Sequence, residues 1–517
     1  MVRNKWDRGS LFIIATFLVI LILRWTKFPI FLDMYYHLSC ALGFDRAGGI
    51  VTHDFWEFAP LGRPHMYPPF LHILMLGFYK IGFSPLSIAR LISVLLYPTL
   101  LASAWYVMRW FSSSPRTAFF ALLLSTIPYG IFLVTTNTIA ASLVVIMALF
   151  SFILIERNRL VAATILLGLA FYTHVMLAFF MAMGLLIYGS IKREKLYSTL
   201  MVIGIGSILA LPWLTHLWNN RAYFTAVSAY ENRYLELYPL NFLLGGIGIA
   251  LILKKRREGY FLIALLLAIL PMAIKHRYRF LCGQGLFILS LMGGFSLEAG
   301  YAAMRRYIVD NKNRAIYLVM LPVVLVLALT FITPSIIVDS EKGSAGFNPR
   351  NSTFTNLVPG YREADEFRAN EVSIYHSRFT SELVGIIESN TKADDIILCN
   401  YSYVGGLLSV LTGRAISTGM LYEVMPIQAK FGLDPVKVSS LVVWIKDPEK
   451  EGDKIFFSLV KKFKLKRIAE TDIAYIYRNP KADTKSEVSD PIISLKLVYL
   501  LLLASFVAIL WDIMRKK

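Results

Sequence analysis

Most of the residues of this chain whose types and spacing could support chemistry lie between Phe31 and Leu74. This segment follows the first long apolar run, and its titratable residues are Asp33, His37, Asp45, Asp54, Glu57, Arg63 and His65. Ionisable groups at a membrane surface are costly to desolvate, so a concentration of them usually marks a functional site. Since most of the remaining sequence is apolar, this segment favours an enzyme as the first interpretation.

Asp33 is the first candidate because it comes just after the end of that apolar run. A carboxylate at this position can face water and a lipid phosphate together, where it could act as a general base toward an acceptor hydroxyl or bind a divalent cation. An isolated aspartate would more often only solvate a helix end, but Tyr35-Tyr36-His37 and Asp54 follow in the same loop. We therefore predict a catalytic role for Asp33.

The second candidate group is Asp54-Phe55-Trp56-Glu57 followed by Gly62-Arg63-Pro64-His65-Met66-Tyr67-Pro68-Pro69. Its prolines and glycine fix a tight backbone path, and its aromatic residues suit the level of the lipid headgroups. We predict Asp54 and His65 as catalytic, and Asp33 with Asp54 as the ligands of Mg²⁺ or Mn²⁺ if a metal is bound; no other cofactor is expected. The residues of the loop predicted to contact acceptor or donor are His37, Glu57, Arg63 and Tyr67.

His276, Arg277 and Arg279 form a cationic group at the outer end of a predicted span. The positive-inside rule disfavours cations on that side, so an anionic partner must offset them. A phosphate or pyrophosphate held by guanidinium groups fits best, and contact with anionic lipid headgroups is the alternative. We predict that these three residues bind the phosphate of a substrate.

Two further polar residues interrupt the apolar sequence on the same predicted side. His174 breaks an apolar stretch in a way that indicates the junction of two helices, and it either satisfies a helix end or contacts the phosphate. Glu231 belongs to an outer loop that either closes over the substrate or is a solvated connection.

Composition places the chain among polytopic membrane proteins. Its 517 residues are 56% hydrophobic and 17% charged, and its mean hydropathy is +0.58. The formal net charge of +19 is spread over short basic clusters between apolar runs, a distribution typical of cytoplasmic membrane loops and not of a nucleic-acid-binding face. Cys40, Cys282 and Cys399 show no metal-ligand spacing. A Cys40–Cys399 bridge or unlinked structural cysteines are the alternatives.

The apolar runs and the basic clusters together predict the topology. With the short run 69–83 kept on the outer surface as a re-entrant or juxtamembrane segment, the basic clusters fall on one side. The chain then has about twelve spans, cytoplasmic termini and a first helix that is retained, since no small-residue cleavage site follows it. The runs are 11–31, 86–108, 117–134, 138–155, 160–173, 174–190, 197–216, 240–253, 260–274, 280–299, 316–338 and 491–511.

This topology divides the chain into a transmembrane domain over 1–338, with a first outer loop at 32–85, an extracytoplasmic α/β domain over 339–490, and a last helix with a cytoplasmic tail over 491–517. Hydrophobic patterning predicts strands at 394–398, 441–445 and 473–477 and helices at 404–412 and 453–464 in the α/β domain.

These motifs resemble the GT-C glycosyltransferases, and among them the catalytic subunits of archaeal oligosaccharyltransferases. The pattern D-x-Y-Y-H from Asp33 and a later Asp-containing stretch that ends in Y-P-P are similar to the first outer loop of that family. Arg277-Tyr278-Arg279-Phe280-Leu281 resembles its lipid-phosphate-binding helix, and 227–231 its outer-loop glutamate motif. The segment from Asp395 to Arg414 is similar to the start of its soluble domain.

The chain departs from that family at two motifs. Asn400-Tyr401-Ser402-Tyr403-Val404-Gly405 stands where the family has W-W-D-Y-G, and Thr135-Thr136-Asn137-Thr138 stands where it has a second acidic metal motif. The first departure argues against N-glycosylation of sequons, and the second argues against a bound metal ion. The motifs that resemble the family's binding site for the lipid-phosphate donor are present.

The resemblance implies an inverting membrane glycosyltransferase in the cell membrane, active on its outer face. It would use a polyprenyl- or dolichyl-phosphate-linked sugar and a protein, lipid or glycan acceptor, with Asp33 as base and no nucleic-acid partner. A lipid-linked-glycan transporter or an inactive assembly subunit are the alternatives.

Overall fold

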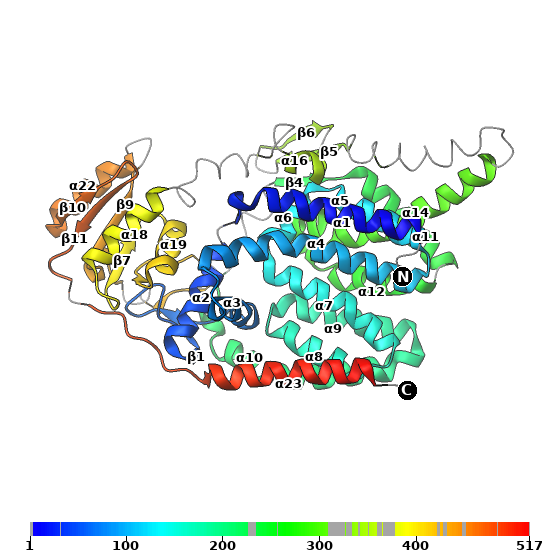
Figure 1. Ribbon diagram of the computed structural model, residues 1–517, viewed down its shortest axis with the longest axis horizontal. Helices are drawn as coiled ribbons and strands as arrows, with labels where there is room; N and C mark the ends of the chain where they lie inside the picture. The colour runs from blue at the N-terminus through cyan, green and yellow to red at the C-terminus, as the bar shows by residue number, and fades with distance from the viewer. Residues whose placement is uncertain are drawn as a thin grey trace.

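The computed structural model describes residues 4–31, 33–225, 234–255, 257–308, 326, 333–339, 342–349, 351–358, 364, 378–420, 424–427, 432–446, 451–482 and 484–515. Long helices run side by side in one body, and a sheet flanked by helices lies beyond one end of it (Figure 1). The chain termini lie together at the opposite end of the body (Figure 1).

The helical body is built from apolar segments whose lengths suit a bilayer. Six helical segments in the described part of the chain are long and apolar enough to cross a membrane, namely Lys5–Leu23, Pro85–Ser112, Ile139–Glu156, Arg193–Asn219, Arg279–Arg306 and Leu495–Met514. The predicted count of twelve spans stays a prediction. The helices of the body are α1 (Lys5–Leu23), α4 (Pro85–Ser112), α5 (Pro115–Thr126), α6 (Tyr129–Asn137), α7 (Ile139–Glu156), α8 (Leu160–Phe171), α9 (Val175–Ile191), α10 (Leu196–Asn219), α11 (Pro239–Lys255), α12 (Tyr260–Ile269), α13 (Met272–Lys275), α14 (Gln284–Ile308) and α23 (Leu495–Met514).

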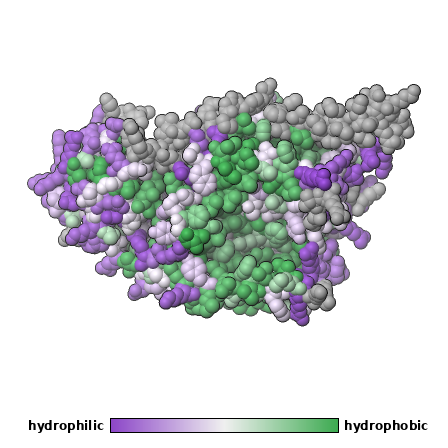
Figure 2. All heavy atoms as spheres, viewed as in Figure 1, coloured by the Kyte–Doolittle hydropathy of each residue, from purple (hydrophilic) through white to green (hydrophobic). Residues whose placement is uncertain are grey.

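Local sequence sets where these helices begin. Asn4 caps α1 through its side chain, which accepts from the Trp6 N–H, and Ser84 and Ser114 cap α4 and α5 in the same way. A proline follows each of the two serines at the first helical position, where its missing N–H costs nothing. The apolar side chains cover the outside of the body, and hydrophilic residues gather at its two ends (Figure 2).

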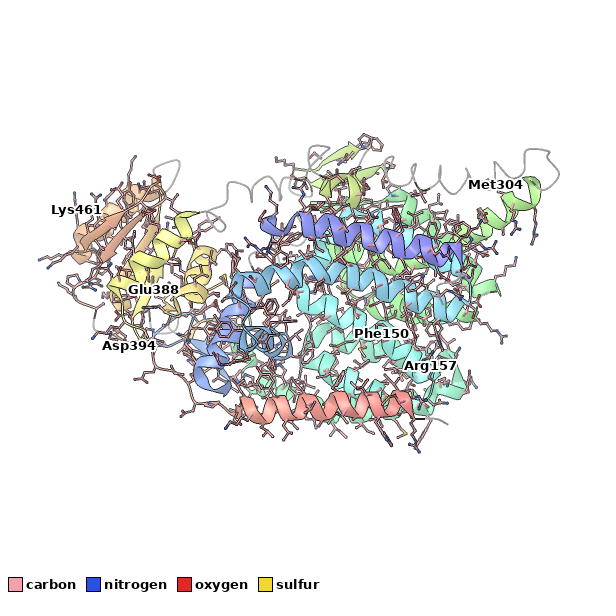
Figure 3. The ribbon with its side chains drawn as sticks, viewed as in Figure 1. Phe150, Arg157, Met304, Glu388, Asp394 and Lys461 are labelled. Atoms are coloured by element: carbon pink, nitrogen blue, oxygen red, sulfur yellow. The ribbon has the colours of Figure 1, made fainter. Side chains whose placement is uncertain are left out.

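Basic side chains at the end that holds the termini are tied to carboxylates from other helices. Ion pairs join Arg109 to Asp7 at 3.3 Å, Arg116 to Glu298 at 3.5 Å and Lys192 to Glu156 at 3.1 Å. Figure 3 places Arg157 at this same end, while Glu388, Asp394 and Lys461 lie at the other end, in the α/β domain. Arg109, Arg116, Arg157 and Lys192, which belong to the predicted basic clusters, thus lie at one end of the body.

The α/β domain contains a five-stranded mixed sheet in the order β10-β11-β9-β7-β8. All four residues of β7 are buried, as expected for a central strand covered on both faces. The five predicted elements of this domain are confirmed within two residues at their ends. The elements are α18 (Arg378–Asn390), β7 (Ile396–Cys399), α19 (Ser402–Thr412), β8 (Ala415–Ile416), α21 (Pro435–Val438), β9 (Leu441–Ile445), α22 (Glu451–Phe463), β10 (Lys466–Glu470) and β11 (Ala474–Arg478).

The predicted boundary at residue 338 falls inside a strand. The apolar run 316–338 lies mostly outside the described residues, and its last part enters β5 (Ser335–Asp339), which pairs with β4 (Tyr234–Leu237) and β6 (Ser344–Asn348). The ladder that β5 forms with β4 and β6 shows that the end of this apolar run is a strand and not the end of a span. The fragment α16 (Thr353–Leu357) follows β6.

The first outer loop folds into two short helices and three short strands at the end of the body nearest the α/β domain (Figure 1). Helix α3 has 11 residues, fewer than the about 20 that a bilayer core requires, in agreement with a segment that does not cross. The strand β12 (Ile493–Ser494), just before α23, pairs with β1 of this loop. The loop elements are α2 (Asp33–Ala47), β1 (Gly49–Ile50), β2 (His53–Asp54), β3 (Arg63–Pro64) and α3 (Phe70–Lys80).

Candidate active site

A cavity of about 900 Å³ lies between the first outer loop, the helical body and the α/β domain. Its walls come from α2, the segment after β3, the α6–α7 junction, the α8–α9 break and the turn before α14, together with Tyr403, Met420 and Val424. Six residues predicted from the sequence share this cavity: Asp33, His37, Tyr67, His174, His276 and Arg279.

Asp33 is the first residue of α2 and its side chain is exposed on the cavity. The residues that follow, Met34, Tyr35 and Tyr36, are buried and anchor the start of the helix. A carboxylate in the first turn of a helix is stabilised by the positive end of the helix dipole. The buried start of α2 thus holds an anionic oxygen acceptor at the cavity.

The cationic wall comes from the segment before α14. Arg279 is the first residue of the π-helical turn Arg279–Gly283, a local widening that is frequent at functional sites. His276, which ends α13, also lines the cavity. Arg277 is exposed and is not part of the lining. Of the three predicted phosphate-binding residues, His276 and Arg279 therefore line the cavity and Arg277 lies outside it.

His174 forms the break between α8 and α9, as predicted, and caps α9. Its Nδ1 accepts the Leu177 N–H at 3.3 Å. Burial lowers the pKa of His174 to about 3, and the nearby charge of Arg279 acts in the same direction. His174 is therefore neutral near pH 7, and because Nδ1 is an acceptor its proton is on Nε2. This N–H is available as a donor for a ligand.

The lowered pKa of His174 predicts a pH dependence of stability. The unfolded chain binds a proton on this residue below about pH 6.5, while the folded chain does not until about pH 3. His174 should therefore contribute a fall in the free energy of unfolding of about 1.4 kcal/mol per pH unit below about pH 6.5, or about 2 kcal/mol at pH 5. In His174→Asn, whose side chain keeps a cap acceptor, the dependence should be smaller by that amount. Thermal unfolding at pH 5 to 8 measures it, and equal profiles would contradict the assignment.

His37 and Tyr67 form the wall between Asp33 and α3. The two rings meet edge to face with centroids 4.8 Å apart. On its far side His37 is hydrogen-bonded through Nδ1 to His72 Nε2 at 3.0 Å. His72 itself is fully buried and does not reach the cavity.

Four other predicted residues form a buried ionic network behind the cavity. Arg63 donates from Nε to Asp54 Oδ2 at 3.2 Å and from Nη2 to Glu57 Oε2 at 2.6 Å, and His65 Nδ1 lies 2.5 Å from Asp54 Oδ1. The pairing of β2 with β3 sets Asp54 opposite Arg63. All four residues are fully buried, and none lines the cavity.

This placement changes the roles expected for the loop. Both carboxylate oxygens of Asp54 are engaged, by Arg63 and His65. Asp54 and His65 therefore do not face a substrate in the cavity, and Asp33 and Asp54 do not form a ligand pair there. Glu57 and Arg63 are likewise fully buried and are not part of the cavity lining.

The network holds the α/β domain against the loop. Glu57 Oε2 accepts the Met420 N–H at 3.3 Å, and Arg63 Nη1 donates to the Val424 carbonyl at 3.4 Å. Met420 and Val424 both line the cavity. Burial raises the pKa of Glu57 to about 7 although the Arg63 guanidinium acts in the opposite direction. The network therefore fixes the part of the cavity wall that Met420 and Val424 form.

Main-chain pairing reinforces the same contact. The Phe58 N–H donates to the Thr418 carbonyl and the Ala59 N–H to the Ile416 carbonyl, both at 2.9 Å, and the Ile416 N–H donates to the Trp56 carbonyl at 3.0 Å. The loop segment thus continues the five-stranded sheet beyond β8, an edge strand that would otherwise expose unpaired backbone groups.

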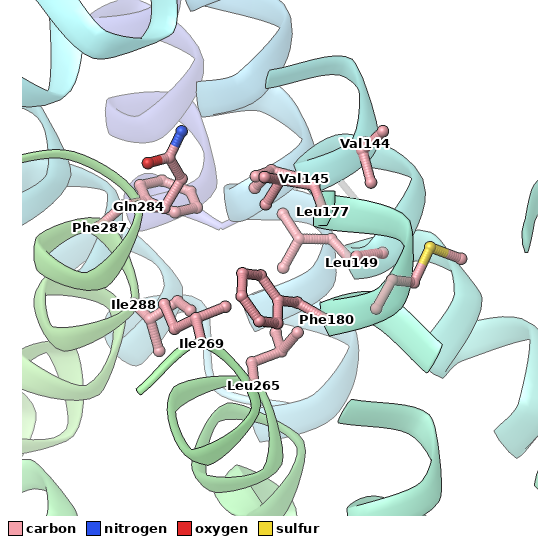
Figure 4. A pocket seen from close by; sticks show the side chains of 12 residues that line it. Val144, Val145, Leu149, Leu177, Phe180, Leu265, Ile269, Gln284, Phe287 and Ile288 are labelled. Carbon is pink, nitrogen blue, oxygen red and sulfur yellow. The ribbon is translucent and has the colours of Figure 1, made fainter. Parts of the chain in front are cut away.

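One wall of the cavity is apolar and comes from the start of α9 and the end of α10. Its residues are Val175, Met176, Phe179, Phe180 and Leu217. Phe180 also lines a smaller cavity of about 30 Å³ deeper in the body, between α7, α9, α12 and α14 (Figure 4). Gln284 is the polar residue in that lining, and its Nε2 donates to Thr138 Oγ1 of the main cavity at 3.5 Å.

Several lining residues were not predicted as site residues. Asn137 and Thr138 line the cavity where the resembled family has its second acidic motif, and Tyr403 lines it from the segment in place of W-W-D-Y-G. Both positions were visible in the sequence as departures from the motifs. Glu231 lies outside the described residues. Cys40, Cys282 and Cys399 are free and buried, so the cysteines are unlinked and the Cys40–Cys399 bridge does not form.

The fold of the chain matches solved structures, while no family profile and no curated protein matches its sequence. The oligosaccharyltransferase of Archaeoglobus fulgidus in complex with zinc and sulfate aligns over 91% of this chain and 73% of its own, with a TM-score of 0.54 and 14% identity. The same enzyme tethered to an acceptor peptide with the NVT sequon aligns over 95% and 75%, with a TM-score of 0.51 and 13% identity. ArnT from Cupriavidus metallidurans, in the apo state, aligns over 90% and 98%, with a TM-score of 0.49 and 13% identity. This chain therefore has the fold of the archaeal oligosaccharyltransferase, as the sequence resemblance predicted.

Proposed function

We propose that this chain is a membrane glycosyltransferase that transfers a sugar or glycan from a polyprenyl phosphate or diphosphate donor to an acceptor. The observation that carries the proposal is the single cavity that joins Asp33, the Arg279 and His276 wall, and an apolar wall at Phe179. A carboxylate, a phosphate-binding cation and a hydrocarbon-compatible surface are what a lipid-phosphate donor and a hydroxyl or amide acceptor require together.

In the proposed reaction the acceptor attacks the anomeric carbon of the donor and the bond to the phosphate oxygen breaks, with inversion. Asp33 accepts the proton that the acceptor loses. The phosphate leaves with the bonding electrons, and the guanidinium of Arg279 stabilises its growing negative charge. His276 and the Nε2–H of neutral His174 add donors on the same wall.

The cavity does not fit a metal held by paired carboxylates. Mg²⁺ and Mn²⁺ prefer oxygen ligands and usually take at least one carboxylate with substrate phosphate. Among the described lining residues Asp33 is the single carboxylate, Asn137 and Thr138 replace the second acidic motif, and Asp54 is bound to Arg63 and His65. No step of the proposed reaction passes through a metal ion.

The acceptor would approach along the wall formed by Tyr403, Met420 and Val424 of the α/β domain. The A. fulgidus enzyme was captured with a sequon peptide, whereas here the segment from Asn400 has a different composition. Asn400 is committed to the sheet, since its side chain bonds both to the N–H and to the carbonyl of Ile445.

The proposed orientation puts the cavity and the α/β domain outside the cell membrane and both termini in the cytoplasm. It is supported by the basic side chains and the termini at the opposite end of the helical body (Figures 1 and 3). The test of function is mass spectrometry of polyprenyl-phosphate sugars from host lipid extract incubated with the purified protein. Consumption of donor supports a transferase. No consumption would favour the transporter or the inactive-subunit interpretation.

Arg279→Gln is expected to lower the rate of donor consumption by about 10²- to 10³-fold, because the leaving phosphate loses its charged donor. Arg277→Gln is the matched control, since Arg277 is two residues away but exposed and outside the lining. Both variants are assayed in vesicles of the same composition, so that any change in contact with anionic lipid headgroups affects the two rates equally. Equal losses in the two variants would contradict a specific phosphate contact at Arg279.

A further inference from the structure

Behind the wall of the cavity lies a buried cluster that the proposed reaction does not use. It consists of Cys40 of α2, His65 just after β3, and His72 of α3, all with exposed fractions of 0%. The Cys40 sulfur and one ring nitrogen of each histidine lie within 4.8 Å of one another. We propose that these three side chains bind a Zn²⁺ ion.

The first support is the state of His65. Its Nδ1 faces Asp54 Oδ1 at 2.5 Å, so Nδ1 carries a proton that it donates to the carboxylate, and Nε2 is the nitrogen that a metal ion would bind. In the described part of the chain Nε2 has no hydrogen-bond partner, although it is buried. Histidines that bind zinc usually donate their other ring N–H to a carboxylate, which fixes the tautomer and the orientation of the ring. His65 has this arrangement with Asp54.

His72 repeats the pattern from the other side. Its Nε2 is hydrogen-bonded to His37 Nδ1 at 3.0 Å, and its Nδ1 is buried with no partner among the described residues. Buried polar atoms are almost always paired, so two orphaned ring nitrogens in one cluster call for an explanation. A metal ion satisfies both at once.

The ligand chemistry selects zinc. One thiolate and two imidazoles suit a borderline-soft ion and do not suit Mg²⁺ or Mn²⁺, which prefer oxygen. Tetrahedral zinc with bonds of about 2.0 Å to nitrogen and about 2.3 Å to sulfur sets its ligand atoms about 3.5 Å apart. The ligand atoms, which lie within 4.8 Å of one another, would have to approach by about 1 Å on binding, with a fourth position left for water or another ligand.

A metal at this place would join three elements of the first outer loop, α2, the segment after β3, and α3. Asp33 begins α2, and His37 connects His72 to the cavity. The ion would therefore have a structural role. It would fix α2, which carries Asp33, relative to the part of the cavity wall that His37 forms. This inference does not depend on the proposed reaction.

The first experiment measures zinc in the full-length protein in detergent by inductively coupled plasma mass spectrometry. Wild type is expected to hold about one zinc per chain after equilibration with ZnCl₂ and removal of the excess, while Cys40→Ser and His72→Asn lose it. Cys399→Ser, at an equally buried free cysteine in the sheet, and Asp33→Asn, in the cavity, should retain it. Wild type without zinc, or equal content in Cys40→Ser and Cys399→Ser, would overturn the proposal.

Cobalt substitution tests the site in wild type, independently of whether the variants fold. Co²⁺ bound by a thiolate and imidazoles should give a sulfur-to-cobalt charge-transfer band in the near ultraviolet and tetrahedral absorption in the visible, both abolished by competing Zn²⁺. Asp33→Asn should give the same spectrum. Binding of Co²⁺ without the thiolate band would exclude Cys40 as a ligand and overturn the assignment.

Discussion

Asp33→Asn is expected to lower sugar transfer by about 10²- to 10⁴-fold, the contribution usually made by a positioned general base. The amide is isosteric with the carboxylate but cannot accept the proton of the acceptor. Asp33 is the exposed first residue of α2 on the cavity, so the exchange leaves the packing of Met34 and Tyr35 unchanged. The measurement is the initial rate of donor consumption, together with the thermal unfolding midpoint to establish that the variant is folded.

Asp45→Asn is the matched control for this experiment. Asp45 belongs to the same helix and is ion-paired with Lys80 at 2.5 Å on the surface, away from the lining residues. Its replacement should change the rate by less than about twofold, because exposed ion pairs contribute little. A fully active Asp33→Asn variant would refute the base assignment, and a rate lost equally in both variants would point to damage in α2.

Arg63→Met is expected to lower the free energy of unfolding by about 3–5 kcal/mol, the largest stability change anticipated for a single residue of the loop. The guanidinium is fully buried between Asp54 and Glu57. Methionine fills much of the volume but leaves both carboxylates without their cation. It also removes the bond to the Val424 carbonyl, so the α/β wall of the cavity should loosen. Thermal or denaturant unfolding in detergent measures the loss.

Lys80→Met makes the same replacement at an exposed ion pair and should cost less than about 1 kcal/mol. A second comparison is Arg63→Met with Glu57→Gln, which removes one of the stranded carboxylates and should recover part of the loss, because contacting residues are not additive. Equal destabilisation by Arg63→Met and Lys80→Met would show that the buried network does not hold the loop.

The elements that sequence predicted well are those with long or strongly patterned apolar segments. The strand at 441–445 matches β9 exactly, and the helix at 453–464 matches α22 within two residues. Strand β10, Lys466–Glu470, was missed because an edge strand exposed to solvent carries little apolar signal. The end of the run 316–338 was wrongly assigned to a span, since five residues of an apolar strand look the same as the end of a helix.

The candidate site was predicted in part, and the division has a physical cause. Sequence could locate Asp33, His174 and Arg279 because each is a charged or polar residue at the boundary of an apolar run. It could not separate Asp54 from Asp33, because both belong to one acidic loop, and only the register of β2 with β3 commits Asp54 to Arg63. Met420 and Val424 reach the cavity through contacts more than 350 residues away in sequence, which no local pattern reports.

The continuation of the five-stranded sheet into the loop at 56–59 has a consequence for protein engineering. The α/β domain is not a module attached by its chain ends alone, because its edge strand and the Met420–Val424 wall are completed by residues of the first loop. A chimera that exchanges only the α/β domain would break the main-chain pairing between the segment 56–59 and β8, and the backbone groups at the edge of β8 would lose their partners. A graft meant to change the acceptor therefore has to include the segment 54–65 as well as the α/β domain, so that both partners of this contact come from the same protein.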